Sequence, residues 1–255
     1  MSRTCVITGA TGFLGGFITA GFLQRGYRVV ALVRPRSDKT PRERTDALMR
    51  FFNMEPGDRL ETVAADIEKP GLGIPENRLS SLRKRTDLIF NCAADTSFAA
   101  RRAERVHSVN VEGVRNLFEA FRGRGHFHQL STAYCAGMKE GPCLETLEEP
   151  TGFHNPYERS KYEAERLITR LCADKDVPLT IHRPAVVYGD CVSGKSLGFT
   201  ALYYPVRVFL LLRDGFERDI RERDGQRARR LGVSLGGDGV MNMPVTIADT
   251  GGAIN

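Results

Sequence analysis

The sequence has no tryptophan, few cysteines and no long hydrophobic run. Its six cysteines are scattered and form no CxxC pair, which argues against a disulfide framework or a zinc site. A membrane-spanning helix needs about 18 consecutive apolar residues, and the most apolar late segment, 201–212, is interrupted by Pro205 and Arg207. The N-terminus shows no signal-peptide apolar stretch or cleavage site. These absences predict a cytoplasmic protein with reduced thiols and no membrane span.

The composition is that of an ordinary globular protein, with 41% hydrophobic and 27% charged residues. A chain of 255 residues can bury roughly 70–75% of its unfolded surface around one main core. The formal net charge of +6 favours anionic partners but does not choose between nucleic acid, a phosphorylated cofactor and an acidic protein. The five histidines have no metal-ligand spacing, so we predict no metal site and no catalytic histidine.

Apolar, β-branched segments alternate with helix-length segments up to about residue 190. The expected strands are residues 4–8, 28–33, 60–65, 87–92, 128–131 and 179–187, and the expected helices are residues 15–25, 45–52, 109–122 and 156–174. Segments 34–44, 68–77 and 139–155 are expected to be exposed loops. This alternation predicts an α/β fold with a doubly wound parallel sheet of the Rossmann type.

The pattern changes beyond Asp190. An aromatic and apolar stretch, a charged run over residues 213–230 and a glycine-rich tail follow. We therefore expect a Rossmann domain in residues 1–190 and a small, apparently shortened substrate-side region in residues 191–255.

A glycine-rich turn lies between the first expected strand and the first expected helix. Residues 8–15 read Thr-Gly-Ala-Thr-Gly-Phe-Leu-Gly, with a glycine at every third position from 9 to 15. Glycine permits a tight turn with positive φ and lets backbone N–H groups approach a pyrophosphate at the positive end of the helix dipole. The pattern predicts a dinucleotide site formed by Gly9, Thr11, Gly12, Phe13, Leu14 and Gly15.

The residues after the second expected strand indicate which dinucleotide binds. NAD-binding forms of this architecture usually place an acidic residue there, but this chain has Arg34 and Arg36. A guanidinium suits a 2′-phosphate that a carboxylate would repel. The predicted cofactor is therefore NADPH, with NADP preferred over NAD. The alternative is that both arginines are only solvated loop charges.

Tyr157 and Lys161 lie four residues apart, and so share one face of the expected helix that Asn155 caps. A phenol with a pKa near 10 is a poor base at neutral pH, and a neighbouring ammonium and a nicotinamide cation would lower that pKa. Upstream, Thr132 follows an expected strand at the sheet edge where ligands bind. Its hydroxyl could hydrogen-bond a substrate carbonyl while Tyr157 donates a proton.

Together these motifs resemble the extended short-chain dehydrogenase/reductase superfamily over about residues 4–200. The resemblance implies carbonyl hydrogen bonding by Thr132, acid–base chemistry by Tyr157, and contact of Lys161 with the cofactor ribose. Asn110 could be a cofactor-side polar group or only a helix cap. Further cofactor contacts are expected at Asn91, Ala93, Ala94, Asp66, Ile67, Pro184, Ala185 and Val187, besides Tyr157 and Lys161. The superfamily also implies a homodimer.

Within this superfamily the sequence is most similar to the thioester-reductase branch, also called male-sterility-like. The similarity lies in residues 12–15, 32–34, 155–165, 189–190 and 193–194. It implies NADPH-dependent reduction of a carbonyl or of an acyl thioester carried on coenzyme A or a carrier protein, with no nucleic-acid partner. Members usually continue further, with a Pro-Val-Asp segment and a C-terminal lid, whereas this chain reads Met-Pro-Val-Thr at 243–246.

Other interpretations stay open. The Asn-Pro-Tyr helix and residues 187–189 also occur in nucleotide-sugar epimerases and dehydratases, and a shortened substrate region would also suit a non-catalytic NADP-binding regulator. Residues 189–196 match the P-loop pattern GxxxxGK[ST], which would instead predict ATP or GTP binding. The charged run over 213–230 could bind the phosphates of coenzyme A or an acidic carrier protein, or form a solvated helix face.

Overall fold

A computed structural model describes residues 2–198 and 203–244. The chain divides into two compact units, the first ending at Ala185 and the second beginning at Val186. The sequence pattern places this boundary slightly later, after Asp190. Residues 245–246 of the Met-Pro-Val-Thr segment lie outside the described residues.

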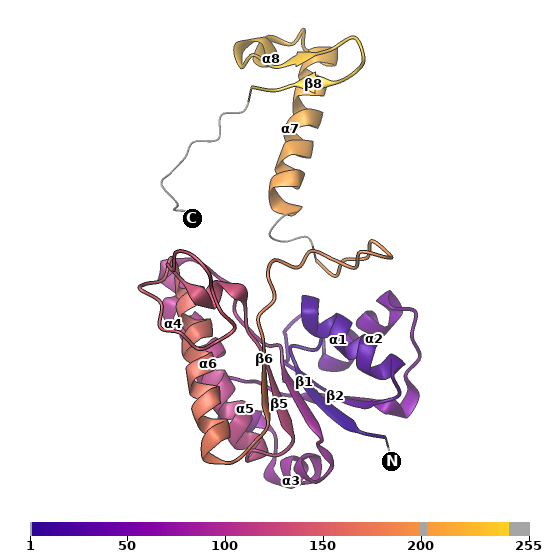
Figure 1. Cartoon of the computed structure of the whole chain (residues 1–255). Helices are drawn as coiled ribbons and strands as arrows, with labels where there is room; N and C mark the ends of the chain where they lie inside the picture. The colour runs from indigo at the N-terminus through magenta and orange to yellow at the C-terminus, as the bar shows by residue number, and fades with distance from the viewer. Residues whose placement is uncertain (1, 199–202, 245–255) are drawn as a thin grey trace. The chain divides into compact units, whose positions relative to one another are not determined.

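The first unit is built on a parallel sheet with the strand order β3-β2-β1-β4-β5-β6 (Figure 1). The strands are β1 (Thr4–Thr8), β2 (Arg28–Val33), β3 (Leu60–Ala64), β4 (Leu88–Asn91), β5 (His126–Leu130) and β6 (Leu179–His182). This order confirms the predicted doubly wound α/β fold. After β3 the chain returns past β1 to form β4, so the order reverses between β1 and β4. In such sheets ligands bind at the carboxyl ends of the strands beside this switch point.

Helices cover the two faces of the sheet, because right-handed crossovers that progress in opposite directions from the switch point place their helices on opposite faces. Figure 1 shows α1 (Phe13–Gln24) and α2 (Pro41–Phe51) on one side and α4 (Ala103–His107), α5 (Gly113–Phe121) and α6 (Pro156–Asp174) on the other. Leucines of α3 (Glu76–Arg85) join a core in which the sheet packs against α5 and α6. Its members include Val6, Ile89, Leu117, Phe127 and Ile168.

Several predicted boundaries were wrong. The expected loops 34–44 and 68–77 are shorter, because α2 begins at Pro41 and α3, which was not predicted, begins at Glu76. The expected strand 179–187 ends at His182, shortly before Pro184, which has no N–H to donate to a ladder. The expected helix 109–122 begins earlier: α4 continues through a π-helical turn, Ser108–Glu112, into α5.

The second unit contains α7 (Tyr203–Glu222), α8 (Gln226–Arg230) and a small antiparallel pair, β7 (Ser234–Leu235) and β8 (Met241–Asn242). Its small core consists of Phe216, Ala228 and Val233. The charged run lies on these two helices and pairs partly with itself, as in the Arg221–Glu217 ion pair. Within residues 2–198 and 203–244, no helix has the length and hydropathy of a membrane-spanning segment.

Candidate functional site

The glycine turn has the geometry that only glycine allows. Gly9 has a φ of +61°, and a Cβ there would lie 2.8 Å from the backbone nitrogen of Ala93. A Cβ on Gly15 would overlap the carbonyl oxygen of Gly9. Gly12 is the N-cap of α1 and supplies no side-chain acceptor for the first helical turn. The N–H groups of that turn are therefore directed toward a ligand position at the positive end of the helix.

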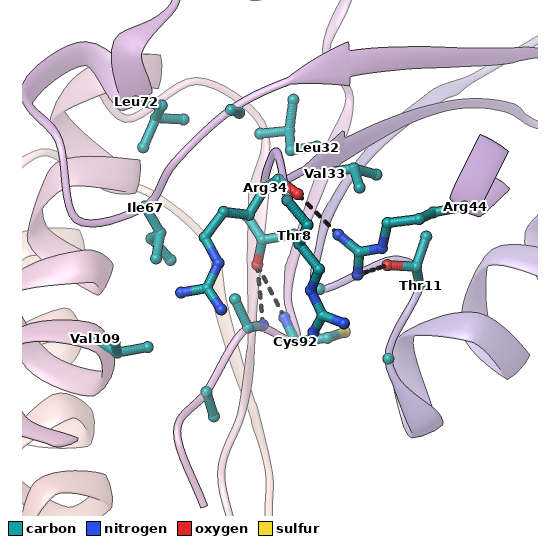
Figure 2. Close-up of a pocket in the computed structure, with 16 residues that line it drawn as sticks. Thr8, Thr11, Leu32, Val33, Arg34, Arg44, Ile67, Leu72, Cys92 and Val109 are labelled. Carbon is teal, nitrogen blue, oxygen red and sulfur yellow. Dashed lines mark hydrogen bonds between the residues drawn. The ribbon is translucent and has the colours of Figure 1, made fainter. Parts of the chain in front are cut away.

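A cavity of about 210 Å³ opens beside this turn, at the carboxyl ends of the neighbouring strands (Figure 2). The predicted cofactor residues that line it are Gly9, Thr11, Gly12, Arg34, Arg36, Ile67, Ala93 and Ala94. The remaining lining residues are Thr8, Leu32, Val33, Arg44, Ala65, Leu72, Cys92 and Val109. Apolar walls around a few polar groups are typical of cofactor sites, and this volume suits part of a dinucleotide.

Three arginines share this cavity: Arg34, Arg36 and Arg44. Arg44 projects from α2 and donates hydrogen bonds to the hydroxyl of Thr11 and to the carbonyl oxygen of Arg34, the latter at 2.8 Å. Burial, together with the positive charges of Arg36 and Arg34, lowers the pKa of Arg44. Because clustered guanidinium groups repel one another, a bound anion would stabilise them.

Arg44 was not predicted as a site residue, because residues 34–44 were expected to form a loop. A signal was present in the chain: Thr40 and Glu43 form a capping box, and Pro41 occupies the first helical position. This cap starts α2 early enough to bring Arg44 to the cavity.

Asn91 and Asp66 are not among the residues that line the cavity; they support the segments that do. Asn91 accepts a hydrogen bond from Thr8 Oγ1 at 2.6 Å and donates one to Gln129 Oε1 at 2.9 Å, so its amide lies inside the sheet. Asp66 accepts from the backbone N–H of Glu68, which shapes the turn that presents Ile67 to the cavity.

Asn110 is also an internal tie. The Asn110 Oδ1 atom accepts a hydrogen bond from the backbone N–H of Asp95. Its Nδ2 atom donates to the carbonyl oxygen of Asp95 and, at 2.8 Å, to the hydroxyl of Ser160 on α6. It therefore joins the π-helical turn to the loop after β4 and to the helix that carries Tyr157, and it does not act as a helix cap.

Helix α6 begins at Pro156, as predicted, because Asn155 caps it. The Asn155 Oδ1 accepts from the N–H of Glu158 at 3.0 Å, and the Glu158 carboxylate accepts from the N–H of His154 at 2.9 Å. This reciprocal cap fixes the first turn. The turn carries Tyr157, whose phenol lies close enough to the Thr132 side chain, just after β5, for that side chain to influence its pKa.

Lys161 is buried one turn further along α6. Its ammonium donates to the carbonyl oxygen of Leu130 at 2.7 Å, and burial lowers its pKa to about 8. Burial also raises the pKa of Tyr157, more than the nearby Thr132 side chain lowers it. In this state the tyrosine is a phenol at neutral pH and can donate a proton.

Ser131, between Leu130 and Thr132, was not predicted as a site residue. Its hydroxyl is buried and, within the described part of the chain, has no hydrogen-bond partner. Buried hydroxyls are normally satisfied, so an unpaired one at a strand end is consistent with a ligand contact. On the neighbouring segment, the carbonyl oxygen of Pro184 accepts from the N–H of Ala133 at 3.0 Å, and Ala185 follows it.

A family model described as Male sterility protein matches residues 7–229. The chain belongs to this NAD(P)-binding family. Among curated proteins it is 30% identical to a hybrid PKS-NRPS synthetase, pvhA, of Talaromyces variabilis, over 73% of this chain and 4% of the synthetase. It is 29% identical to an isonitrile lipopeptide synthase of Streptomyces coeruleorubidus, over 74% of this chain and 13% of that protein. The chain thus spans a small part of these relatives.

Solved structures give the same assignment. The terminal R domain from the myxalamid PKS-NRPS pathway matches with a TM-score of 0.65 and 29% identity, over 74% of this chain and 50% of that domain. The reductase domain of a nonribosomal peptide synthetase from Mycobacterium tuberculosis matches with a TM-score of 0.62 and 26% identity, over 75% and 50%. This male sterility family member is therefore homologous to thioester-reductase-type domains and spans about half their length.

Residues 189–196 of this male sterility family member lack the setting of a P-loop. The preceding described strand, β6, ends at His182. The carboxylate of Asp190 accepts from the backbone N–H groups of Val192 and Ser193, groups that a P-loop would offer to a phosphate. The loop lies in the second unit, as does Val187, one of the predicted cofactor residues.

Proposed function

We propose that the chain is an NADPH-dependent reductase of a carbonyl or acyl thioester, with Thr132, Tyr157 and Lys161 as its catalytic set. One observation carries this proposal. A cavity lined by the glycine turn and three arginines opens at the carboxyl ends of β1 to β4, on the edge of the sheet where Thr132 follows β5 and lies beside Tyr157. Membership in the male sterility protein family supports the same chemistry.

The residues present fit NADPH. The turn at Gly9 and Gly15 excludes side chains, and Arg34, Arg36 and Arg44 supply positive charge for the 2′-phosphate. The buried hydroxyl of Ser131 would gain a partner on the nicotinamide side. When bound, NADPH would supply the hydride for the reduction.

The protein residues supply the proton and the electrostatics. The Thr132 hydroxyl would hydrogen-bond the carbonyl oxygen of the substrate, and Tyr157 would donate its phenolic proton to that oxygen. The Lys161 ammonium would stabilise the phenolate that remains. With an aldehyde or ketone the product is an alcohol. With a thioester the carbon–sulfur bond then breaks, and a thiol and an aldehyde are released.

A carrier-bound acyl thioester is the substrate class that the relatives favour. Two of the matched structures are reductase domains of synthetase pathways, and a further one is a thiolation-reductase di-domain from an archaeal nonribosomal peptide synthetase. We extend this class to the present chain on the strength of family membership. Coenzyme A thioesters and free aldehydes are the arms of the screen that compare a carrier with simpler substrates.

The direct test is Tyr157→Phe, assayed for NADPH oxidation with acyl thioesters and aldehydes. Loss of the proton donor should reduce kcat by at least ~10²-fold, the lower range for a general acid, and leave NADPH affinity intact. Tyr134→Phe is the matched control, since this nearby tyrosine contacts the same Phe98 ring as Tyr157. Full activity of Tyr157→Phe would refute the assignment. Bound cofactor that is never consumed would favour nucleotide-sugar chemistry or a non-catalytic role.

A further inference from the structure

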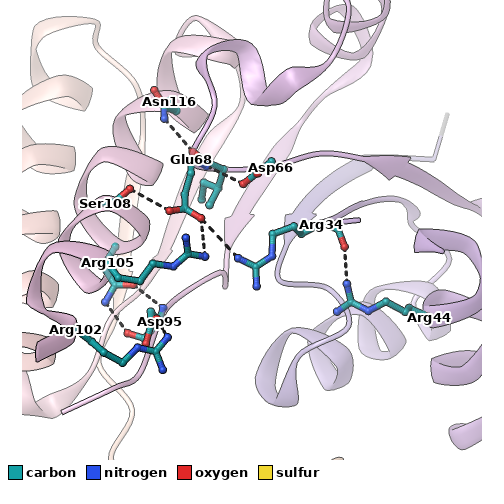
Figure 3. A network of polar contacts seen from close by, with 11 residues as sticks. Arg34, Arg44, Asp66, Glu68, Asp95, Arg102, Arg105, Ser108 and Asn116 are labelled. Atoms are coloured by element: carbon teal, nitrogen blue, oxygen red, sulfur yellow. Dashed lines mark hydrogen bonds and ion pairs between the residues drawn. The ribbon is translucent and has the colours of Figure 1, made fainter. Parts of the chain in front are cut away.

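An ionic network lies beside the cofactor cavity, with the Glu68 carboxylate at its centre (Figure 3). Its Oε2 atom is 2.9 Å from Arg105 Nη2 and 3.7 Å from Arg34 Nη1, and its Oε1 atom accepts from the Ser108 hydroxyl at 3.1 Å. The Glu68 side chain is 17% exposed, against 47% for Arg34. The carboxylate is thus held in place, while the guanidinium that it attracts is freer.

Arg34 has two separate attachments. Its carbonyl oxygen accepts from Arg44, which fixes its backbone beside the cavity, whereas its guanidinium extends toward Glu68. A 2′-phosphate bound by Arg34 must compete with this carboxylate. The phosphate would also be repelled by the same negative charge. Both effects weaken the binding of NADP and leave NAD, which lacks the 2′-phosphate, almost unaffected.

Arg105 reduces this competition. Arg105 is closer to the Glu68 carboxylate than Arg34 is. Together with Ser108, it holds this carboxylate from the side opposite to Arg34 (Figure 3). The positions of Glu68, Arg34 and Arg105 therefore determine how much positive charge on Arg34 is available to the 2′-phosphate.

We propose that Glu68 is a specificity-determining residue that limits the preference for NADP over NAD by competing with the 2′-phosphate for Arg34. This inference rests on the proposed NADPH site. It predicts that removing the Glu68 carboxylate increases the affinity for NADPH more than the affinity for NADH. Removing Arg105 should have the opposite effect.

The experiment measures the Kd of NADPH and of NADH for the full chain and for Glu68→Gln by fluorescence titration. The Kd of NADPH should fall about three- to tenfold, the range expected for release of a half-exposed ion pair plus relief of repulsion, and the Kd of NADH less than about twofold. Glu112→Gln is the matched control. It removes the same charge from the neighbouring helical turn, where Glu112 pairs with Arg115 at 3.1 Å, and both Kd values should stay unchanged.

Two further variants test the route of the effect. Arg105→Met should reduce the preference for NADPH by about two- to fivefold, because Glu68 then pairs more fully with Arg34. In an Arg34→Met background, Glu68→Gln should change the NADPH-to-NADH ratio less than it does in the unsubstituted chain, because only the relief of direct repulsion remains; a double-mutant cycle measures this difference.

The outcomes separate this inference from the proposed function. If the unsubstituted chain shows no preference for NADPH, the cofactor assignment fails. If it prefers NADPH and Glu68→Gln leaves that preference unchanged or weakens it, Glu68 orients Arg34 or is irrelevant to it. The inference is then overturned, while the cofactor assignment stands.

Discussion

The missing side chain at Gly15 determines how closely helix α1 approaches the glycine turn. A Cβ at this position would meet the backbone oxygen of Gly9, which cannot move without reshaping the turn. We expect Gly15→Ala to raise the Kd of NADPH at least tenfold and to destabilise the fold by about 1–3 kcal/mol, the range for overpacking. Fluorescence titration and thermal melts measure the two effects.

Gly21→Ala provides the comparison for Gly15→Ala on the same helix. The added Cβ would meet only the flexible end of the Arg25 side chain at 3.3 Å, and alanine favours the helix. This variant should bind NADPH normally. Equal NADPH binding by the Gly15 variant would contradict the assignment of the turn as the pyrophosphate site.

The buried ammonium of Lys161 should make activity depend on pH. Its pKa is lowered to about 8, whereas that of Tyr157 is raised above its ordinary value near 10. Above a pH of about 8 the lysine loses the charge that stabilises the phenolate, although the tyrosine still carries its proton. We therefore expect kcat/KM for reduction to fall as the pH rises through about 8, and to show no such step in Lys161→Met. A wild-type profile that stays flat to about pH 10 would exclude this role.

The candidate site residues that could be predicted from the sequence are those whose spacing follows from the local geometry of a turn or a helix. Glycines at every third position, and a tyrosine four residues before a lysine, are visible without a fold. Arg44 and Glu68 were missed because their contacts join different elements, and Ser131 was missed because only the fold shows that its hydroxyl is buried without a hydrogen-bond partner among the described residues. Arg44 reaches Thr11 from the next helix, and Glu68 joins Arg34 to Arg105 across the sheet edge.

At the scale of elements, a row of imidazole rings crosses strands β5 and β6. His128 stacks on Phe90 with 4.1 Å between ring centroids, lies against His126, and its Nδ1 is 3.1 Å from His182 Nε2. The rings are stacked, and no metal-binding cluster occurs among the residues that the structure describes. Burial and the neighbouring imidazoles lower the pKa of His128 to about 4.

This row should make stability sensitive to acid. The unfolded chain, with a histidine pKa near 6.5, binds more protons than the folded chain between pH 4 and 6.5, so stability is lost as the pH falls through this window. We expect His128→Phe, which keeps the ring stack on Phe90, to lose less Tm than the unsubstituted chain between pH 7 and 4.5. His154→Gln, outside the row, serves as control. Identical Tm losses in all three chains would show that the row does not titrate.

The elements followed from the sequence where their own residues dictate them. The buried β-branched runs of β1 and β2, and the cap at Asn155, gave boundaries that the structure reproduces. Helix α3 was missed because only Leu79 and Leu82 are buried among its charged residues, so its apolar pattern is weak. The strand β6 was predicted too long, since the apolar residues of 185–187 continue the pattern past the proline that ends it.

At the scale of the whole molecule, the first unit contains both the arginine-lined cavity and the Tyr157–Lys161 helix. The chain spans about half the length of the reductase domains that it matches, so substrate selection is a separate question from cofactor binding and proton transfer. Composition and charge could not resolve these functions, because a net charge of +6 suits many anionic partners. The presence of the arginine-lined cavity and of Tyr157 in the same unit narrows the range of anionic partners to a dinucleotide cofactor in our proposal.

The measurement that tests this account most directly is a parallel titration of the full chain with NADPH, NADH and ATP. Fluorescence follows the reduced dinucleotides and thermal shift follows all three. The account predicts that NADPH binds about tenfold or more tightly than NADH, by about 1.4 kcal/mol or more, and that ATP binds weakly. Arg44→Met should reduce this preference. Binding of ATP alone, or tighter binding of NADH than of NADPH, would contradict it.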